Sequence, residues 1–122
     1  MNQLKITHSL EGTLLVSHVA VDAAPLMAGF AVNLRELAAS ARASGDFWIF
    51  ACGCGTPGCG GIERGVVVTH SAGQTRWLVP RANSRREFEF DSGEYRAAVM
   101  AALTQVRSLQ EEMQEDRALV AA

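Results

Sequence analysis

Three cysteines lie in one short, glycine-rich segment, at Cys52, Cys54 and Cys59. Between them, Pro57 and Gly58 suit the central positions of a type II turn, because proline fixes φ and glycine accepts a positive φ. Such a turn doubles the chain back and brings Cys59 opposite Cys54, while Cys52 points to the same side if its strand stays extended. The spacing therefore predicts three sulfurs gathered at the end of a strand.

Three kinds of chemistry fit these thiols. Three thiolates and a fourth ligand would hold a tetrahedral zinc ion, and this is the leading interpretation. The structural alternative is a metal-free turn in which the cysteines pack as small apolar side chains. Thiol redox chemistry is the third, since cross-strand cysteines reach disulfide distance. However, the segment has neither the Cys-x-x-Cys spacing nor a helix N-terminus that would lower a thiol pKa.

The sequence does not identify the fourth zinc ligand. His70 lies well along an expected strand, too far to reach the sulfurs unless the strand bends, and it is expected to pack beside Trp77. His8 and His18 fall on opposite faces of an expected hairpin, His8 on the apolar one. Glu63 lies on the sulfur side, and water is a further option. The ligand stays open at this point.

Other clusters of charge are weaker candidates. Four arginines surround Trp77 and raise the question of a phosphate or RNA site, but the net charge of −2 favours solvated strand-edge charges. The acidic residues near the C-terminus are typical of the wet face of a helix. The sequence carries no Gly-x-Ser-x-Gly, His-Glu-x-x-His, phosphate-binding or dinucleotide-binding motif. It therefore leans away from an enzyme. The arginines are Arg76, Arg81, Arg85 and Arg86.

Composition limits the class of protein. The 122 residues are 48% hydrophobic and 20% charged, as expected for one globular domain spanning residues 1–122. No apolar run is long enough to cross a bilayer, and the first residues lack the pattern of a secretory signal. An odd number of clustered cysteines is typical of a reducing compartment. We therefore expect a cytoplasmic protein with no membrane or nucleic-acid partner.

The elements that position the cysteines follow from apolar periodicity. A hairpin over residues 4–21, turning at Glu11-Gly12, is expected to place its apolar residues on one face. Asp22 would then cap a helix that ends at Gly45. The apolar run 47–51, directly before the cysteines, indicates a strand buried on both faces. The shared-face residues are Leu4, Ile6, Leu10, Leu15, Val19 and Val21.

After the cysteines, the pattern predicts a strand to Ser71, a turn at Ala72-Gly73 and a return strand over 75–79. A polar loop over 80–85 and an edge strand over 87–90 follow. Asp91 and Glu94 resemble a capping box that opens a long helix with a polar end. The fold class is thus α+β, with a mainly antiparallel sheet of about five to six strands in the order ββαβββ(β)α and two helices packed on it.

The segment from Trp48 to Ile62, followed by valines and Trp77, resembles a pattern in small bacterial proteins of no established function. In these proteins a Cys-x-Cys-Gly-x-x-Gly-Cys-x-Gly loop follows an aromatic strand and precedes a hairpin bearing a tryptophan. The resemblance covers about residues 47–79 and implies a bacterial origin and a real structural unit. It implies no activity, substrate or site residue.

The sequence thus favours a non-enzymatic interaction or ligand-binding domain, with a cysteine-rich loop held by zinc. Its partner would be an unidentified protein or a second copy in a homodimer, because the long helix ends in polar turns that a single small domain does not need. The alternative is a thiol-based redox enzyme or sensor that uses Cys52, Cys54 and Cys59.

Overall fold

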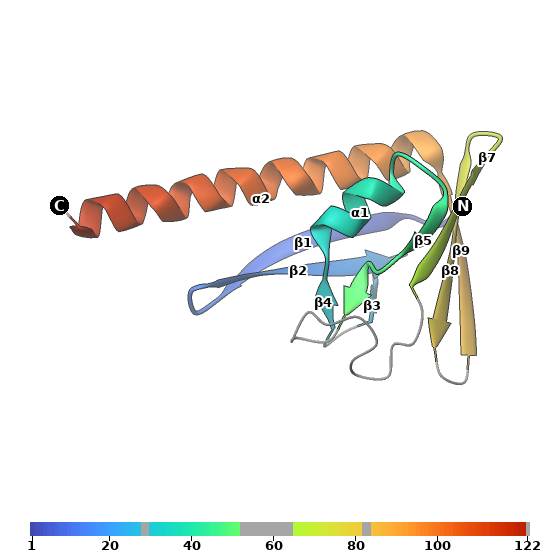
Figure 1. Cartoon of the computed structure of the whole chain (residues 1–122), viewed down its shortest axis with the longest axis horizontal. Helices are drawn as coiled ribbons and strands as arrows, with labels where there is room; N and C mark the ends of the chain where they lie inside the picture. Colours follow the sequence, from blue (N-terminus) through green and yellow to red (C-terminus); the bar gives the residue numbers. More distant parts are fainter. Residues whose placement is uncertain (28–29, 52–64, 82–83, 122) are drawn as a thin grey trace.

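The chain folds as an α+β protein in which helices pack on mainly antiparallel sheets (Figure 1). The computed structural model describes residues 1–27, 30–51, 65–81 and 84–121, without the side chains at 81, 84–85 and 115–121. The elements are β1 (Leu4–Glu11), β2 (Leu14–Val21), β3 (Ala24–Leu26), β4 (Ala31–Val32), α1 (Leu34–Ser40), β5 (Gly45–Phe47), β6 (Phe50–Ala51), β7 (Val66–Ser71), β8 (Gln74–Arg81), β9 (Ser84–Asp91) and α2 (Ser92–Ala121).

The described strands form three sheets. Their orders are β1-β2-β3, β4-β6 and β5-β7-β8-β9, and every pairing is antiparallel. The predicted class is therefore confirmed, whereas the strand count is higher because short strands replace parts of the expected first helix and of the expected buried strand. Helix α2 runs along the β1–β2 hairpin, and the four-stranded sheet lies at its N-terminal end (Figure 1).

The first hairpin has the predicted faces and a turn one residue later than predicted. Glu11 pairs with Leu14, so the turn residues are Gly12 and Thr13, and Gly12 has the positive φ of 67° that a tight turn needs. Because the pairs run from Leu4↔Val21 to Leu10↔Leu15, the predicted apolar set still shares one face. His8 lies on that face and His18 on the other, as predicted.

The expected helix from Asp22 to Gly45 is wrong in its first half. Asp22 and Ala23 adopt left-handed φ values of 52° and 65°, which turn the chain into β3 instead of starting a helix. The helix begins after Asn33, whose side-chain oxygen accepts hydrogen bonds from the backbone N–H groups of residues 35 and 36. Asparagine, not aspartate, therefore provides the N-cap, and α1 is only seven residues long.

The expected strand over residues 47–51 is also divided. Phe47 ends β5, which pairs with β7, whereas Phe50 begins β6, which pairs with β4. Ile49 lies between them, is fully buried, and accepts a hydrogen bond from the backbone N–H of Asn33 at 2.8 Å. The run is apolar on both faces because its two ends belong to two different sheets, and not because it forms one central strand.

The β7–β9 region matches its prediction more closely. Ala72 and Gly73 form the turn, with φ values of 50° and 77°. The predicted loop over residues 80–85 is too long, since the β8–β9 ladder continues to the pair Arg81↔Ser84. Asp91 caps α2 as predicted, because its Oδ2 accepts a hydrogen bond from the N–H of Glu94 at 3.0 Å.

Asn2 joins two of the sheets. Its backbone N–H donates to the carbonyl of Glu89 at 2.7 Å, and its Oδ1 accepts from the N–H of Glu89 at 2.8 Å. Its Nδ2 donates to Asp22 at 2.6 Å. The hydrogen bonds from Asn2, and next from the N–H of Gln3, lower the pKa of Asp22. The chain before β1 therefore covers part of the β9 edge, a position where bare backbone invites pairing with other chains.

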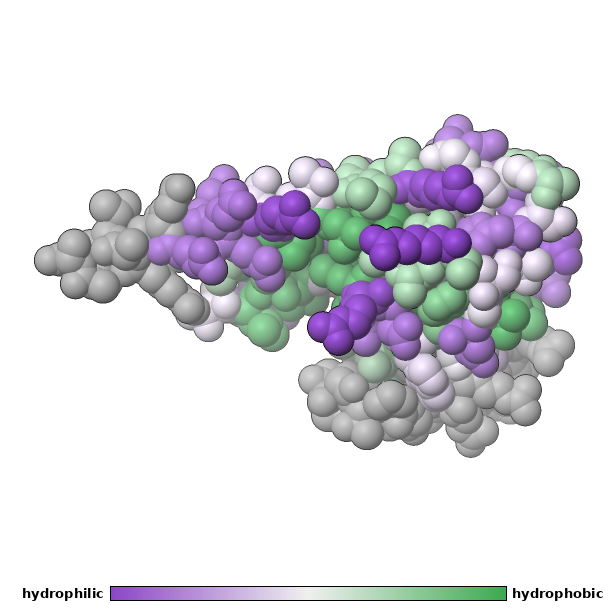
Figure 2. Space-filling model, turned by 45° about the horizontal axis from the view of Figure 1, so that its top comes forward, coloured by the Kyte–Doolittle hydropathy of each residue, from purple (hydrophilic) through white to green (hydrophobic). Residues whose placement is uncertain are grey.

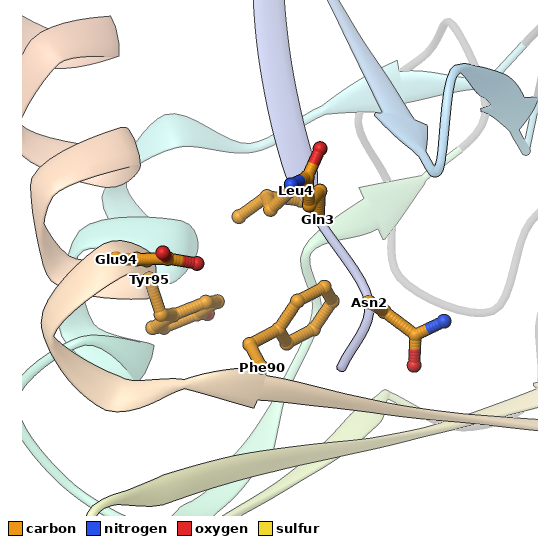
Figure 3. Close-up of a pocket in the computed structure, with 6 residues that line it drawn as sticks. All are labelled: Asn2, Gln3, Leu4, Phe90, Glu94 and Tyr95. Atoms are coloured by element: carbon orange, nitrogen blue, oxygen red, sulfur yellow. The ribbon is translucent and has the colours of Figure 1, made fainter.

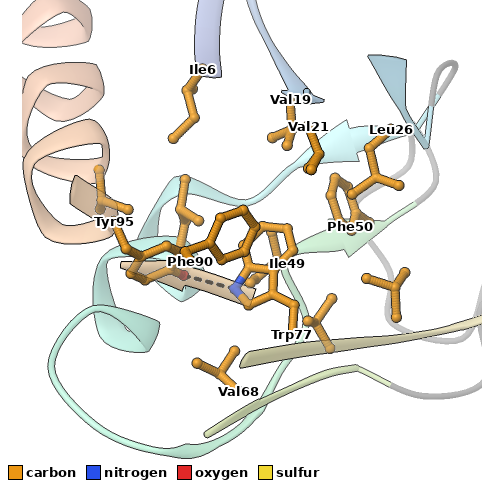
Figure 4. Packing of buried hydrophobic residues seen from close by; sticks show 14 of the residues in the cluster. Ile6, Val19, Val21, Leu26, Ile49, Phe50, Val68, Trp77, Phe90 and Tyr95 are labelled. Carbon is orange, nitrogen blue, oxygen red and sulfur yellow. Dashed lines mark hydrogen bonds between the residues drawn. The ribbon is translucent and has the colours of Figure 1, made fainter. Parts of the chain in front are cut away.

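A buried hydrogen-bonded chain crosses the core where α1, α2 and β8 meet. Trp77, Tyr95 and Ser40 are each at most 1% exposed. The indole Nε1–H of Trp77 donates to Tyr95 Oη at 3.0 Å (Figure 4). Tyr95 Oη also lies 2.6 Å from Ser40 Oγ. Ser40 Oγ in turn donates to the carbonyl of Leu37 at 2.6 Å, so the Tyr95 hydroxyl must be the donor to Ser40. The donor and the acceptor of each of these three hydrogen bonds are therefore assigned.

Aromatic packing surrounds this polar chain. The rings of Phe50, Phe90 and Tyr95 stand edge-on to Trp77, with centroids 6.2, 5.4 and 5.9 Å away. Burial raises the pKa of Tyr95, so the hydroxyl stays protonated at neutral pH and keeps its donor role. The aromatic rings thus enclose a line of donors and acceptors in which every member has a hydrogen-bonding partner.

Substitution Tyr95→Phe is expected to lower the free energy of unfolding by about 1–3 kcal/mol, because it leaves the buried indole N–H of Trp77 without an acceptor. Urea denaturation of both proteins measures the difference. Thr69→Val, on the exposed face of β7, is the control and should change stability by less than about 0.5 kcal/mol. An equal effect of both substitutions would contradict the assigned role of Tyr95.

Candidate functional site

The three predicted zinc ligands lie outside the described residues, so Cys52, Cys54 and Cys59 stay a prediction. The structure does fix both ends of their segment. Ala51 ends β6 and is buried, and Gly65 follows the segment directly before β7. A Cβ atom on Gly65 would lie only 2.7 Å from the carbonyl oxygen of Phe47, so this close approach requires glycine. Phe47 itself pairs with Val66.

No group of three or more histidine, cysteine or acidic side chains gathers among the described residues. His70 is held by the protein: its Nε2 lies 2.6 Å from the carbonyl of Ser40, and its Nδ1 lies 2.9 Å from Thr75 Oγ1. It also packs against Tyr95, with ring centroids 6.2 Å apart. His70 is thus a packed histidine beside an aromatic ring, as expected, but that ring belongs to Tyr95 and not to Trp77.

Trp77 is not open for stacking, and of the four arginines around it the structure describes the side chains of Arg76 and Arg86. Trp77 has no exposed surface, so its ring is not open to a base. Arg76 forms a 2.6 Å ion pair with Glu89 on the outer face of the sheet, and its pKa is raised by this hydrogen bond and by the charge of Glu89. These observations favour the solvated strand-edge interpretation over nucleic-acid binding.

His8 connects the first hairpin to α2. Its Nε2 lies 3.1 Å from the carbonyl of Ala102, and its Nδ1 lies 2.8 Å from Ser17 Oγ, the residue directly opposite on β2. A carbonyl only accepts hydrogen bonds, so Nε2 carries the proton and the Ser17 hydroxyl donates to Nδ1. Burial lowers the pKa of His8, and the neutral ring therefore fits this arrangement.

The Ser17–His8 distance resembles that of a nucleophile and its base, but the setting differs. In serine hydrolases a carboxylate stabilises the imidazolium that forms during the reaction. Here the second nitrogen of His8 meets a helix carbonyl, and burial disfavours the charged ring. The pair is therefore better suited to holding hairpin and helix together than to activating Ser17.

A long groove opens beside this connection, between β2, β4 and α2. Its volume is about 560 Å³, and apolar side chains provide most of its wall. A groove of this size is large enough for several side chains of a binding partner. Its lining consists of Glu11, residues 14–18, residues 30–32, Leu34, Val106 and Gln110.

Apolar surface continues from the groove to both projecting parts of the molecule. At the hairpin tip, Leu14 lines the groove and is 65% exposed, whereas Leu10, on the opposite face of the hairpin, is 54% exposed. Helix α2 continues past this tip (Figure 1), and beyond Val106 its apolar residues Leu109 and Met113 are only half-buried. Figure 2 shows apolar surface along this part of the molecule, bordered by strongly polar side chains. The face is thus amphipathic, with an apolar floor and charged margins.

A smaller pocket of about 250 Å³ lies beside the N-terminal residues (Figure 3). Leu4 and the rings of Phe90 and Tyr95 face it, and Glu94 lies at its edge. Glu94 is the one carboxylate in the lining, and no histidine, cysteine or lysine accompanies it there. The pocket therefore has no acid–base pair for catalysis.

The groove was not predicted from the sequence. The sequence pattern predicts that Leu10 points to the inner face of the hairpin, and it does. It is nevertheless exposed, because the hydrophobic core does not extend to the hairpin tip. The polar end of the second helix was the available signal, since it indicated turns beyond the needs of one domain. Searches against protein-family models, curated proteins and solved structures return no significant match, so the groove is interpreted from its own geometry. No helix of the described residues is long and apolar enough to cross a membrane.

We expect the stability of the protein to fall as the pH drops below about 6.5, the ordinary histidine pKa. His8 has a lowered pKa in the folded state, so the unfolded chain binds its proton first and gains free energy from it. The loss from this one group is at most about 1.4 kcal/mol per pH unit. Urea denaturation between pH 7.5 and pH 5 measures it.

His8→Gln removes this titration and should flatten the pH dependence of stability. His18→Gln, on the other face of the hairpin, is the matched control and should retain most of it. If the wild type and His8→Gln lose stability in parallel on acidification, His8 does not carry the effect.

Proposed function

We propose that the protein is a non-enzymatic interaction domain whose binding surface is the groove between β2, β4 and α2. The observation that carries this proposal is the exposed apolar surface at one end of the groove, where Leu14 is 65% exposed beside a cavity of about 560 Å³. Large apolar side chains that line a concave, polar-rimmed surface are typical of interaction sites.

The energetics support a protein partner. Covering a leucine side chain contributes about 1.5–3 kcal/mol, so burial of Leu14 and the groove floor would contribute favourably to the free energy of binding. An elongated groove between a hairpin and a helix also matches the way in which amphipathic helices are bound. By contrast, the pocket beside the N-terminal residues has a single carboxylate, Glu94, and no histidine or cysteine in its lining.

The proposal includes a zinc ion bound by Cys52, Cys54 and Cys59, with a fourth ligand still to be identified. It rests on the sequence spacing, the turn at Pro57-Gly58 and the reduced thiols expected in a bacterial cytoplasm. His70 and His8 have both ring nitrogens within hydrogen-bonding distance of protein groups, which leaves His18, an acidic side chain or water as the better fourth ligand. Zinc would act structurally here.

A photo-crosslinking amino acid in place of Leu14, expressed in the source cells, tests the interaction surface. We expect covalent protein adducts from position 14, because its exposed side chain lies at the groove. The control carries the same amino acid in place of Val67, which is 39% exposed on the outer sheet face, and should give few adducts. No adduct at position 14 would contradict the proposed function.

Elemental analysis of protein purified without chelator tests the metal. We expect one zinc per chain and thiols that react with a thiol reagent only after denaturation, because metal-bound thiolates are protected. Cys59→Ser should lose the zinc, whereas Ser9→Ala should keep it. Three freely reacting thiols without metal would overturn the zinc assignment, and a thiol that titrates well below its ordinary pKa would point to redox chemistry instead.

A further inference from the structure

We propose that the edge of β2 beside the groove accepts an extended segment of a partner protein as an additional strand. This inference rests on the proposed function, since it names the conformation and the chemistry of the partner at the same surface. The segment would pair through its backbone with Leu15 and Ser17 and place apolar side chains in the groove.

The register of β2 shows which of its backbone groups point toward the groove. Proline has no N–H, so the pair Ala20↔Pro25 is of the non-hydrogen-bonded kind, and the β2 residues on either side of Ala20 direct their N–H and C=O groups toward β3. Because this direction alternates along a strand, Leu15 and Ser17 direct theirs to the same edge. The two-residue hairpin turn agrees, since the residues that close such a turn bond to each other and the next pair does not.

The described part of the chain leaves this edge of β2 without a strand. There β3 pairs only with residues 19–21, and the left-handed φ of 54° at Met27 turns the chain away from the edge. The hairpin therefore projects past β3 toward its tip (Figure 1). Among the described residues, the outward backbone groups of Leu15 and Ser17 have no hydrogen-bonding partner. All five residues 14–18 line the groove, so the groove follows the strand edge and not a single face of the hairpin.

These backbone groups favour a strand over a helix as the occupant, although the elongated groove has room for either. Any partner that fills the groove displaces water from the N–H and C=O groups of Leu15 and Ser17, and a buried backbone group without a hydrogen bond is costly. A helix uses its own N–H and C=O groups internally and would leave these groups unsatisfied. An added strand satisfies them, as in other complexes in which a sheet edge binds a peptide.

The lining of the groove defines the side chains of the partner. The groove follows five residues of β2, so a segment of similar length fits. Leu15 is on the hairpin face that packs on α2, and partner side chains on that face would meet Val106 and should be apolar. Glu11 is the one acidic residue of the lining, which contains no lysine or arginine, so a basic residue at the hairpin-tip end would be complementary in charge. The expected partner segment is therefore extended, apolar at alternate positions and basic at one end.

Proline substitution tests the backbone pairing. Leu15→Pro removes the outward N–H and leaves the bonds between β1 and β2 in place, because the pair Leu10↔Leu15 is non-hydrogen-bonded. Leu10→Pro is the matched control, since it makes the same change on the opposite edge of the hairpin. With the photo-crosslinking amino acid at position 14, the yield of adduct should fall at least about tenfold in Leu15→Pro and change less than about twofold in Leu10→Pro. Leu15→Ala keeps the N–H and should lose less adduct than Leu15→Pro.

The outcomes separate this inference from the proposed function. An adduct that persists in Leu15→Pro, or that falls equally in Leu15→Ala, overturns the added strand and leaves the interaction surface in place. An adduct of twice the chain mass identifies a second copy and overturns a separate partner. The absence of any adduct in the otherwise unchanged chain overturns both proposals.

Backbone methylation of the partner segment gives a test on the unaltered protein. The segment found in the adduct by mass spectrometry is made as a series of synthetic peptides, each with one N-methyl group. A strand bonds to an edge through alternate residues, so methylation at every second position should raise the dissociation constant at least about tenfold, whereas the positions between should change it little. Equal effects at all positions would overturn the inference.

Discussion

The structure depends on how one line of polar groups is buried inside an apolar core. Trp77, Tyr95 and Ser40 come from β8, α2 and α1, and each is almost fully buried. A buried donor without an acceptor is costly, so the three elements can pack in only those positions that satisfy the chain. No described buried side-chain polar atom lacks a hydrogen-bonding partner. Hydrophobic burial supplies the driving force for folding, while these hydrogen bonds select one arrangement of the helices on the sheet.

His70 and His8 extend the same principle to neighbouring contacts. His70 links β7 to the end of α1 through the Ser40 carbonyl, and His8 links β1 to the middle of α2 through the Ala102 carbonyl. In both cases the imidazole Nε2 donates to a helix carbonyl, and Nδ1 lies within hydrogen-bonding distance of a hydroxyl across the strand pair. The histidines are thus connectors between helix and sheet, which explains why they are not gathered as a metal site among the described residues.

The fold class, the hairpin faces, the Ala72-Gly73 turn and the Asp91 cap follow from local patterns, because alternation, turn chemistry and capping depend on neighbours in sequence. The structure of the region from Asp22 to Ala51 does not follow from local patterns. There, left-handed residues at 22 and 23 and the division of the apolar run at Ile49 are set by tertiary packing, which overrides propensity. The groove is a product of how hairpin and helix diverge, and no single segment encodes that divergence.

The fixed ends of the cysteine segment have a consequence for any ion bound there. Ala51 is held by its pairing with Ala31, and Gly65 is held by its close approach to Phe47, which pairs with Val66. Loop closure, which in small zinc-dependent domains is the main entropic barrier to assembling the ligands, is therefore met by the sheet itself. If zinc binds there, it would bind a segment whose flanking residues are already held by strand pairing. Metal exchange and folding would then be separate events in this protein.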